Sequence, residues 1–120
     1  MKLDHIGIAV KDLESSLKIY IEGLGLRLIK VEEVPEENVK VAMLDAGGVR
    51  IELLEGIGED SAVRKYIEKR GEGIHHIAFK VDDVDKISEE LKGKGFKLVY
   101  SSPKLVAGGS RKVNFIHPKS

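Results

Sequence analysis

The hydrophobic and polar positions follow two periods along the chain, and these periods predict a mixture of strands and helices. Residues 3–10 alternate with period two and are rich in Ile and Val, which is typical of a strand. Apolar residues then recur at helical spacing over about 13–22, with Asp12 as the expected N-cap. Further strands are expected at 26–32, 39–45 and 49–55. The first part of the chain is therefore predicted to form a β-α-β-β-β unit.

The second part of the chain repeats this pattern. A linker helix is expected over 62–70, and the later elements are a strand at 74–81, a helix over 84–92 and strands at 96–100 and 112–117. In register, His5 aligns with His76 and Val10 with Val81. An internal repeat of this kind indicates two copies of one structural unit. The predicted fold class is α+β, with two tandem β-α-β-β-β modules.

Length and pattern predict a single domain over 1–120. Module one is expected over about 1–58, the linker helix over about 60–71 and module two over about 72–120. In the second copy of the repeat, the strand that corresponds to residues 49–55 would fall beyond Ser120. The second module is therefore expected to be one strand short.

Composition narrows the possible functions. The 120 residues contain 20 basic and 20 acidic side chains, and this balance gives no general attraction to nucleic acid or an anionic membrane. The absence of cysteine excludes disulfides, thiolate nucleophiles and Cys-ligated zinc. No apolar stretch approaches the roughly 20 residues of a membrane span, and no signal-peptide pattern is visible. A cytoplasmic location is expected.

The candidate chemistry is carried by His5, Glu52 and His76. The two histidines occupy equivalent places in the repeat, so paired modules can turn both towards one cavity. Glu52 lies in an apolar strand, where a carboxylate is costly unless it is paired or bound to a metal. Two imidazoles and a carboxylate suit a divalent transition metal such as Co, Ni, Mn, Fe or Zn.

Simpler explanations exist for each of these residues. A lone histidine in a buried strand is more often a hydrogen-bonded core residue than a ligand; the repeated pair with a third acidic position favours the metal site. Alternation puts His75 on the face opposite His76, as a structural or exposed residue. The segment 107–111, AGGSR, offers backbone N–H groups and an arginine to an anion, but an ordinary loop explains it equally well.

Four segments resemble a known family. DHIGIAV, RIELLEG, GIHHIAFKVDD and especially PKLVAGGSRKVNFIHPKS are similar to methylmalonyl-CoA epimerases of the vicinal oxygen chelate (glyoxalase-type) superfamily. In that family, paired modules form an open, cup-shaped mixed sheet around one divalent metal ion. The resemblance implies Co²⁺ as the expected ion here, with Mn²⁺, Ni²⁺ or Zn²⁺ as alternatives. Three family ligands carry over onto His5, Glu52 and His76.

The resemblance also implies a reaction. The expected activity is 1,1-proton transfer at C2 of methylmalonyl-CoA, which interconverts its epimers through a metal-stabilised enediolate. The family's fourth ligand, a glutamate, would lie on the missing last strand. A second acid/base glutamate of some epimerases aligns with Val41, which cannot transfer protons. Glu52 is therefore the remaining candidate acid/base. The resemblance implies a homodimer and a small-molecule acyl-CoA substrate. Candidate contacts to CoA phosphates are Ser110, Arg111, Lys112 and Lys119.

Two other functions remain open on the sequence. A glyoxalase I-type lactoylglutathione lyase would use similar ligands and enediolate chemistry, but is expected to lack the NFIHPKS segment. A ligand-binding protein of the bleomycin-resistance type uses the same fold without the metal ligands. A ring-cleaving dioxygenase is disfavoured by the short chain.

Overall fold

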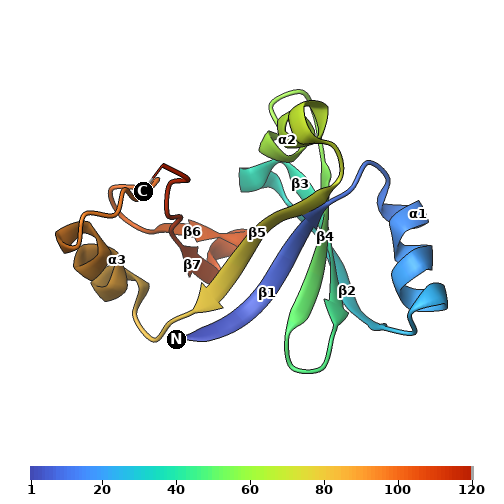
Figure 1. The fold of residues 1–120 in the computed structure, drawn as a ribbon, viewed down its shortest axis with the longest axis horizontal. Helices are drawn as coiled ribbons and strands as arrows, with labels where there is room; N and C mark the ends of the chain where they lie inside the picture. The colour runs from blue at the N-terminus through green and yellow to red at the C-terminus, as the bar shows by residue number, and fades with distance from the viewer. Residues whose placement is uncertain (120) are drawn as a thin grey trace. The chain divides into compact units, whose positions relative to one another are not determined.

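The chain forms two compact units in the computed structural model, which describes residues 1–119 (Figure 1). One unit comprises residues 2–80, and the other comprises residues from 81 onward together with Met1. The larger unit holds the three residues of the candidate metal site. It is therefore described first.

The larger unit is built on a five-stranded mixed sheet with the strand order β2-β3-β4-β1-β5. Only the β1–β4 pair is parallel; the other neighbours are antiparallel. The first strand and the strand that opens the second repeat therefore lie side by side, as the predicted module pairing requires. The strands are β1 (Lys2–Ala9), β2 (Arg27–Val34), β3 (Val39–Asp45), β4 (Arg50–Gly56) and β5 (Gly73–Lys80).

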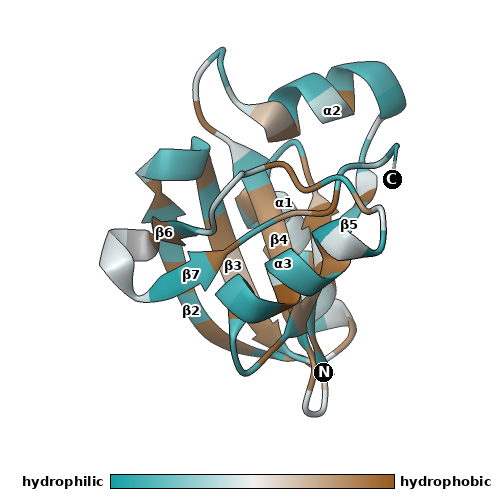
Figure 2. Cartoon of the chain, turned by 90° about the vertical axis from the view of Figure 1, so that its left-hand side faces the viewer, coloured by the Kyte–Doolittle hydropathy of each residue, from teal (hydrophilic) through white to brown (hydrophobic). Residues whose placement is uncertain are grey.

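Helices cover both faces of this sheet, and each face has its own apolar cluster. Helix α1 (Leu13–Lys18), which continues as the π-turn η1 (Ile19–Gly23), packs against a cluster that includes Leu44 and Leu53. Helix α2 (Ala62–Arg70) packs against the other face. The buried residues of that second cluster are Ala9, Val34, Val39, Val41, Met43, Leu54 and Val63. Figure 2 shows the hydrophobic stretches of β3 and β4.

Most predicted elements of this unit are confirmed within a residue or two. The short 3-10 turn η2 (Pro35–Glu37) ends at Asn38, whose φ of 51° closes the turn between β2 and β3. Asp12 caps α1 by accepting the backbone N–H of Ser15, and Ser61 caps α2 by accepting that of Arg64. In both cases a side-chain oxygen satisfies a backbone donor that the helix itself leaves unpaired.

The Ser61 cap gives a first testable prediction. Ser61 is fully buried, and its Oγ lies 3.3 Å from the Arg64 nitrogen at the start of α2. We expect Ser61→Ala to lower the free energy of unfolding by about 1 kcal/mol, because the backbone N–H of Arg64 loses its acceptor. Urea denaturation measures this change, with Ser102→Ala in an exposed loop as the control. Equal stability of the two variants would show that the cap contributes nothing.

The smaller unit departs from the sequence-based expectation. Helix α3 (Val84–Gly93) forms as predicted, but the expected strand at 96–100 is reduced to one isolated bridge between Leu98 and Ile116. The only named strands among its described residues are β6 (Lys104–Val106) and β7 (Arg111–Val113), which pair across the 3-10 turn η3 (Ala107–Gly109). The prediction of a strand over 112–117 is therefore wrong beyond residue 113, and β6 was missed.

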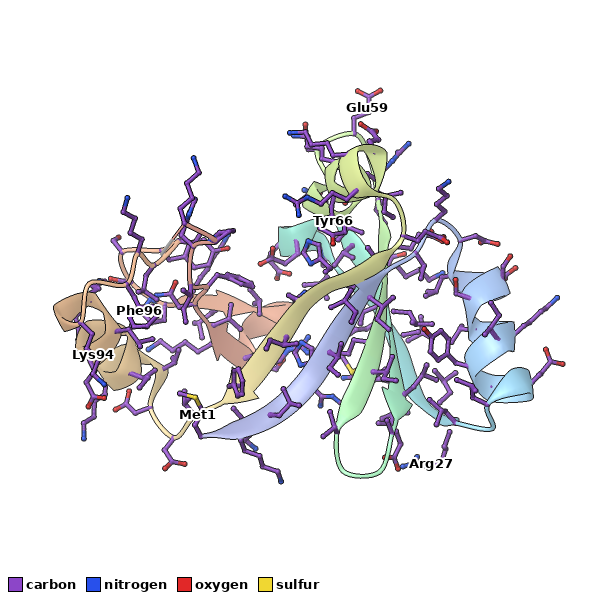
Figure 3. The ribbon with its side chains drawn as sticks, in the orientation of Figure 1. Met1, Arg27, Glu59, Tyr66, Lys94 and Phe96 are labelled. Atoms are coloured by element: carbon purple, nitrogen blue, oxygen red, sulfur yellow. The ribbon has the colours of Figure 1, made fainter. Side chains whose placement is uncertain are left out.

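Asn114 explains the interruption. Its Oδ1 accepts the backbone N–H of Tyr100 at 3.1 Å, and its Nδ2 donates to the Tyr100 carbonyl oxygen at 3.1 Å. The side-chain amide thus takes the place of a neighbouring backbone in the ladder. Backbone bonds resume on the far side, where Val99 donates to Phe115 and His117 donates to Lys97. Figure 3 labels Phe96 and Lys94 at the end of α3, where this irregular segment begins.

None of the helices among residues 1–119 is long and apolar enough to cross a membrane.

Candidate metal centre

Glu52 and His76 lie on either side of Gly7 in one row across the sheet. Glu52 on β4 pairs with Gly7 on β1, and Gly7 pairs in turn with His76 on β5. His5 precedes Gly7 by two residues, so the strand period puts its side chain on the same face. The structure thus brings His5, Glu52 and His76 together on the face that α2 covers further along the strands.

The two imidazoles face each other through the same ring atom. Nε2 of His5 lies 3.2 Å from Nε2 of His76, and the rings meet edge to face with centroids 5.3 Å apart. Two nitrogens that each bind one ion at about 2.0–2.1 Å are separated by about 2.9–3.4 Å. The observed separation therefore fits two ligands of a single divalent metal ion.

Gly7 makes room for this arrangement. A Cβ atom at residue 7 would lie 2.3 Å from Cε1 of the His76 ring and 2.7 Å from its Nδ1. The His76 ring therefore rests directly on the backbone of β1, on the side towards Glu52. Any larger residue at position 7 would occupy the space that the ring uses.

Glu52 supplies the acidic member of the site. It is only 4% exposed, and its Oε2 lies 3.4 Å from Nδ1 of His5. In this structure its charge is balanced by Arg50, whose Nη2 lies 2.9 Å and whose Nε lies 3.1 Å from Oε2. A buried carboxylate needs such a cationic partner, and a divalent metal ion can fill the same role.

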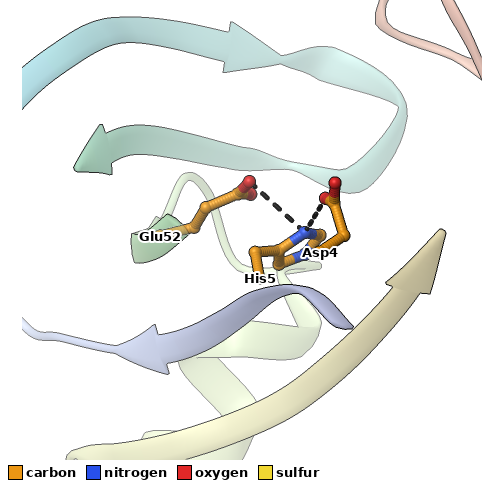
Figure 4. Close-up of side chains that lie close together, drawn as sticks. All are labelled: Asp4, His5 and Glu52. Atoms are coloured by element: carbon orange, nitrogen blue, oxygen red, sulfur yellow. Dashed lines mark hydrogen bonds and ion pairs between the residues drawn. The ribbon is translucent and has the colours of Figure 1, made fainter. Parts of the chain in front are cut away.

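Asp4 joins the site from the strand position next to His5. Its Oδ2 lies 2.7 Å from Nδ1 of His5 and 2.7 Å from Nη2 of Arg50. Figure 4 shows Asp4 and Glu52 reaching the same imidazole, and the ligand atoms of Asp4, His5 and Glu52 all lie within 4.8 Å of one another. These three side chains are therefore a second arrangement that could hold a cation.

The two arrangements differ in what Arg50 does. A metal ion among Asp4, His5 and Glu52 would compete with the guanidinium for both carboxylates, because Arg50 contacts the oxygens of each. Ligation through the two Nε2 atoms requires only that Glu52 turn from Arg50 towards the imidazoles, while Arg50 keeps Asp4. The donor set with His76 therefore fits a metal ion better.

His75 lies beside His76, not on the opposite face as alternation predicts. Its Nδ1 is 2.9 Å from Nδ1 of His76, and its ring packs edge to face on Tyr66 of α2 with centroids 4.9 Å apart. The register of β1 and β5 slips between the Gly7–His76 and Ile8–Ile74 pairs, which leaves His75 as an extra residue on β5. This β-bulge turns its side chain out of the regular alternation.

Burial favours the uncharged form of His75 and His76. Burial, reinforced by His5 and His75, lowers the pKa of His76 to about 4, and burial also lowers the pKa of His75. Partial burial tends to raise the pKa of Asp4, but the hydrogen bond with His5 and the charge of Arg50 outweigh it and hold the pKa below its usual value. His76 is therefore held as neutral imidazole and Asp4 as ionised carboxylate, and these are the forms that bind metal.

The low pKa of His76 predicts how stability depends on pH. In the unfolded chain the imidazole of His76 takes up a proton near pH 6.5, whereas in the folded chain it does so only near pH 4. Between these values the unfolded state binds more protons, so the free energy of unfolding of the metal-free chain should fall as the pH falls from 6.5 towards 4. Urea denaturation across this range measures the effect. His76→Gln should show a smaller fall, and an equal fall in both proteins would contradict the assignment to His76.

The predicted CoA contacts lie in the smaller unit. Arg111 and Lys112 belong to β7, Ser110 directly precedes it, and Lys119 donates its backbone N–H to Nδ1 of His117 at 3.1 Å. The ammonium group of Lys112 is paired with the carboxylate of Asp85 on α3, which already balances its charge. Contact between these four residues and CoA phosphates stays a prediction.

Comparison with known proteins identifies the family. A family model described as the Glyoxalase/Bleomycin resistance protein/Dioxygenase superfamily matches residues 4–115. The chain belongs to this superfamily. It is 38% identical over 118 residues to the uncharacterized protein YqjC of Bacillus subtilis, with 98% of this chain and 84% of that protein covered. The α+β fold class predicted from the repeat and the glyoxalase-like fold implied by the family resemblance are thereby confirmed.

Other members of the superfamily carry functional names. The chain is 33% identical over 119 residues to the ethylmalonyl-CoA/methylmalonyl-CoA epimerase of Cereibacter sphaeroides, covering 98% of this chain and 89% of that protein. A solved structure of a Streptomyces coelicolor methylmalonyl-CoA epimerase variant in complex with 2-nitronate-propionyl-CoA matches with a TM-score of 0.89 and 38% identity, covering 99% of this chain and 89% of that one. The predicted resemblance to methylmalonyl-CoA epimerases is confirmed, and through these relatives so is the prediction of an isomerase.

Proposed function

We propose that this protein is a metal-dependent methylmalonyl-CoA epimerase whose ion is held by His5, Glu52 and His76. The observation that carries the proposal is the pair of Nε2 atoms 3.2 Å apart above Gly7, with a buried carboxylate in the same row of the sheet. The names of the two epimerase relatives support the choice of substrate.

The substrate explains why such a site is useful. C2 of methylmalonyl-CoA lies between a thioester and a carboxylate, so its proton can leave if the electron pair that remains is delocalised onto the thioester oxygen. A divalent ion at the site would supply positive charge to the oxygens that become more negative in this step. The Cereibacter sphaeroides relative is named for ethylmalonyl-CoA and methylmalonyl-CoA, and both compounds have this arrangement.

Glu52 is the group that we propose to move the proton. Its carboxylate would accept the proton from C2 as the C–H bond breaks, and the opposite epimer forms when an acid returns a proton to the other face of C2. Val41, which pairs with Leu54 on the same face, has no group that can do so. Glu52 therefore has two proposed roles, as a ligand and as an acid/base.

The proposal includes the expectations that the comparisons leave open. Co²⁺ is the expected ion, with Mn²⁺, Ni²⁺ or Zn²⁺ as alternatives. A homodimer, a cytoplasmic location and contacts between CoA phosphates and the second unit's basic segment belong to the same proposal. Those contacts would come from Ser110, Arg111, Lys112 and Lys119.

Deuterium incorporation tests the proposal. The purified chain is stripped of metal, mixed with methylmalonyl-CoA in D₂O, and supplied in turn with Co²⁺, Mn²⁺, Ni²⁺ or Zn²⁺. We expect metal-dependent gain of one deuterium at C2, read by mass spectrometry against samples without protein and with chelator. The hemithioacetal of methylglyoxal and glutathione is the competing substrate. Turnover of that compound, with no exchange into methylmalonyl-CoA, would overturn the proposal in favour of a glyoxalase.

A further inference from the structure

Two β-bulges lie next to the two histidines, one on each strand of the β1–β5 pair. The register passes from Leu3–Phe79 to His5–Ala78, which leaves Asp4 as an extra residue on β1. It passes from Gly7–His76 to Ile8–Ile74, which leaves His75 as an extra residue on β5. Each extra residue directly precedes one of the facing imidazoles.

The bulges obey the symmetry of the internal repeat. Aligning His5 with His76 also aligns Asp4 with His75. The cross-strand pair His5–Ala78 then corresponds to His76–Gly7, with the two strands exchanged. The same backbone irregularity therefore occurs twice, at equivalent places, and only at these two places along the β1–β5 ladder of the described residues. Bulges next to functional sites commonly re-aim a side chain.

Each bulge brings a polar side chain to the same ring atom of the histidine that follows it. The carboxylate of Asp4 lies 2.7 Å from Nδ1 of His5, and Nδ1 of His75 lies 2.9 Å from Nδ1 of His76. In a regular strand, adjacent residues point to opposite faces, and neither contact would form. In both histidines the remaining nitrogen, Nε2, is the one that faces its counterpart.

We infer that Asp4 and His75 are positioning residues that fix the tautomers of His5 and His76, an inference that rests on the proposed metal site. With a metal ion bound, an acceptor at Nδ1 keeps the ring proton there, so that the lone pair of each imidazole is on Nε2. In the metal-free chain the two Nε2 atoms lie 3.2 Å apart and share one proton, which His76 carries because Asp4 holds the ring proton of His5 at Nδ1. Neither residue binds the ion in this arrangement. Both act through the histidine beside them.

Both positioning residues are themselves held in place. Arg50 donates to Asp4 from β4, and the ring of His75 rests on Tyr66, whose hydroxyl donates to the Ile74 carbonyl oxygen at 2.7 Å. Figure 3 labels Tyr66 on the side of α2 that faces the sheet. Helix α2 thereby supports His76 through the ring of His75. Strand β4 supports His5 through the carboxylate of Asp4.

The tautomers can be measured without any metal ion or substrate. Long-range ¹H–¹⁵N NMR of the metal-free chain at pH 8 distinguishes an Nδ1-protonated ring from an Nε2-protonated one. In the unmodified metal-free chain we expect Nδ1–H on His5 and Nε2–H on His76, which donates to Nε2 of His5 at 3.2 Å. Asp4→Ala should release His5 to the Nε2–H form, which free imidazole side chains prefer. His75→Phe keeps a ring on Tyr66 and should leave the His5 tautomer unchanged, so its effect is measured through metal affinity.

Zn²⁺ affinity, measured by competition with a chromophoric chelator, is the second readout. We expect Asp4→Ala and His75→Phe each to weaken binding by about 10- to 100-fold. Asp4→Asn should restore most of the affinity, because its amide oxygen can still accept from Nδ1. Glu89→Ala is the matched control, since Glu89 also pairs with a basic side chain, Lys92, but on the exposed surface of α3.

The outcomes separate this inference from the proposed function. An Nδ1–H tautomer of His5 that Asp4→Ala loses, together with weaker Zn²⁺ binding by both variants, would support the positioning roles even if methylmalonyl-CoA showed no exchange. An Nε2–H tautomer of His5 in the unmodified chain, or variants that bind Zn²⁺ as tightly as the unmodified chain, would overturn them even if exchange were fast.

Discussion

Replacing Gly7 with alanine should remove metal binding and proton exchange while leaving the chain folded. The new Cβ would lie 2.3–2.8 Å from three atoms of the His76 ring, and no side chain tolerates such an approach. The ring must therefore move away from β1, which separates its Nε2 from that of His5. Because ligand and base geometry matter at the scale of 1 Å, we expect C2 exchange to fall by about 100-fold or more.

The cost to folding should be smaller than the cost to function. Overpacking of this kind lowers the free energy of unfolding by about 1–3 kcal/mol, which urea denaturation measures. Gly93→Ala is the control, because a Cβ at Gly93 meets nothing within 4 Å. If the Gly7→Ala protein bound one metal ion as tightly as the unmodified chain, the position of the His76 ring over β1 would not be needed for metal binding.

Replacing Glu52 with glutamine should separate the two roles proposed for this residue. The amide keeps an oxygen that can bind a metal ion, but it cannot accept a proton from C2. We expect the metal to remain bound and the rate of deuterium incorporation to fall by about 10²- to 10⁴-fold. Metal analysis after gel filtration and the exchange assay on the same sample measure the two effects together.

Glu55 provides a matched control for Glu52. It lies on the same strand but on the opposite face, where its Oε1 accepts the Leu13 N–H at the start of α1 at 2.7 Å. Glu55→Gln should therefore leave exchange unchanged. If Glu52→Gln exchanged deuterium at the unmodified rate, another group would be the base, and Glu52 would be a ligand alone.

Period-two alternation was sufficient to predict the central part of the site. It put His5 and Gly7 on one face of β1 and Glu52 with Leu54 on one face of β4, and the structure has both arrangements. The repeat added His76, because equivalent strands of two modules lie side by side. These features depend on regular strand geometry, which a sequence pattern encodes directly.

The same rule failed where the strands are irregular. Asp4 was not recognised at all, and His75 was assigned to the wrong face, because each is the extra residue of a bulge. Neither extra residue is a glycine, and the sequence therefore does not mark the extra position of either bulge. The one available signal was the repeat itself, which aligns a polar residue before each histidine.

Competition between side chain and backbone explains the error in the smaller unit. Residues 96–100 and 112–117 have strand-like patterns, and part of a ladder does form between them. The Asn114 amide then takes both backbone hydrogen bonds of Tyr100, which no periodicity would reveal.

X-ray absorption spectroscopy of the Co²⁺-loaded chain tests the account most directly. The account predicts one ion per chain with two imidazole nitrogens and carboxylate oxygen among its ligands, and the loss of one imidazole in His76→Ala. A spectrum with no more than one histidine in the unmodified chain, or one that His76→Ala leaves unchanged, would contradict the proposed metal centre.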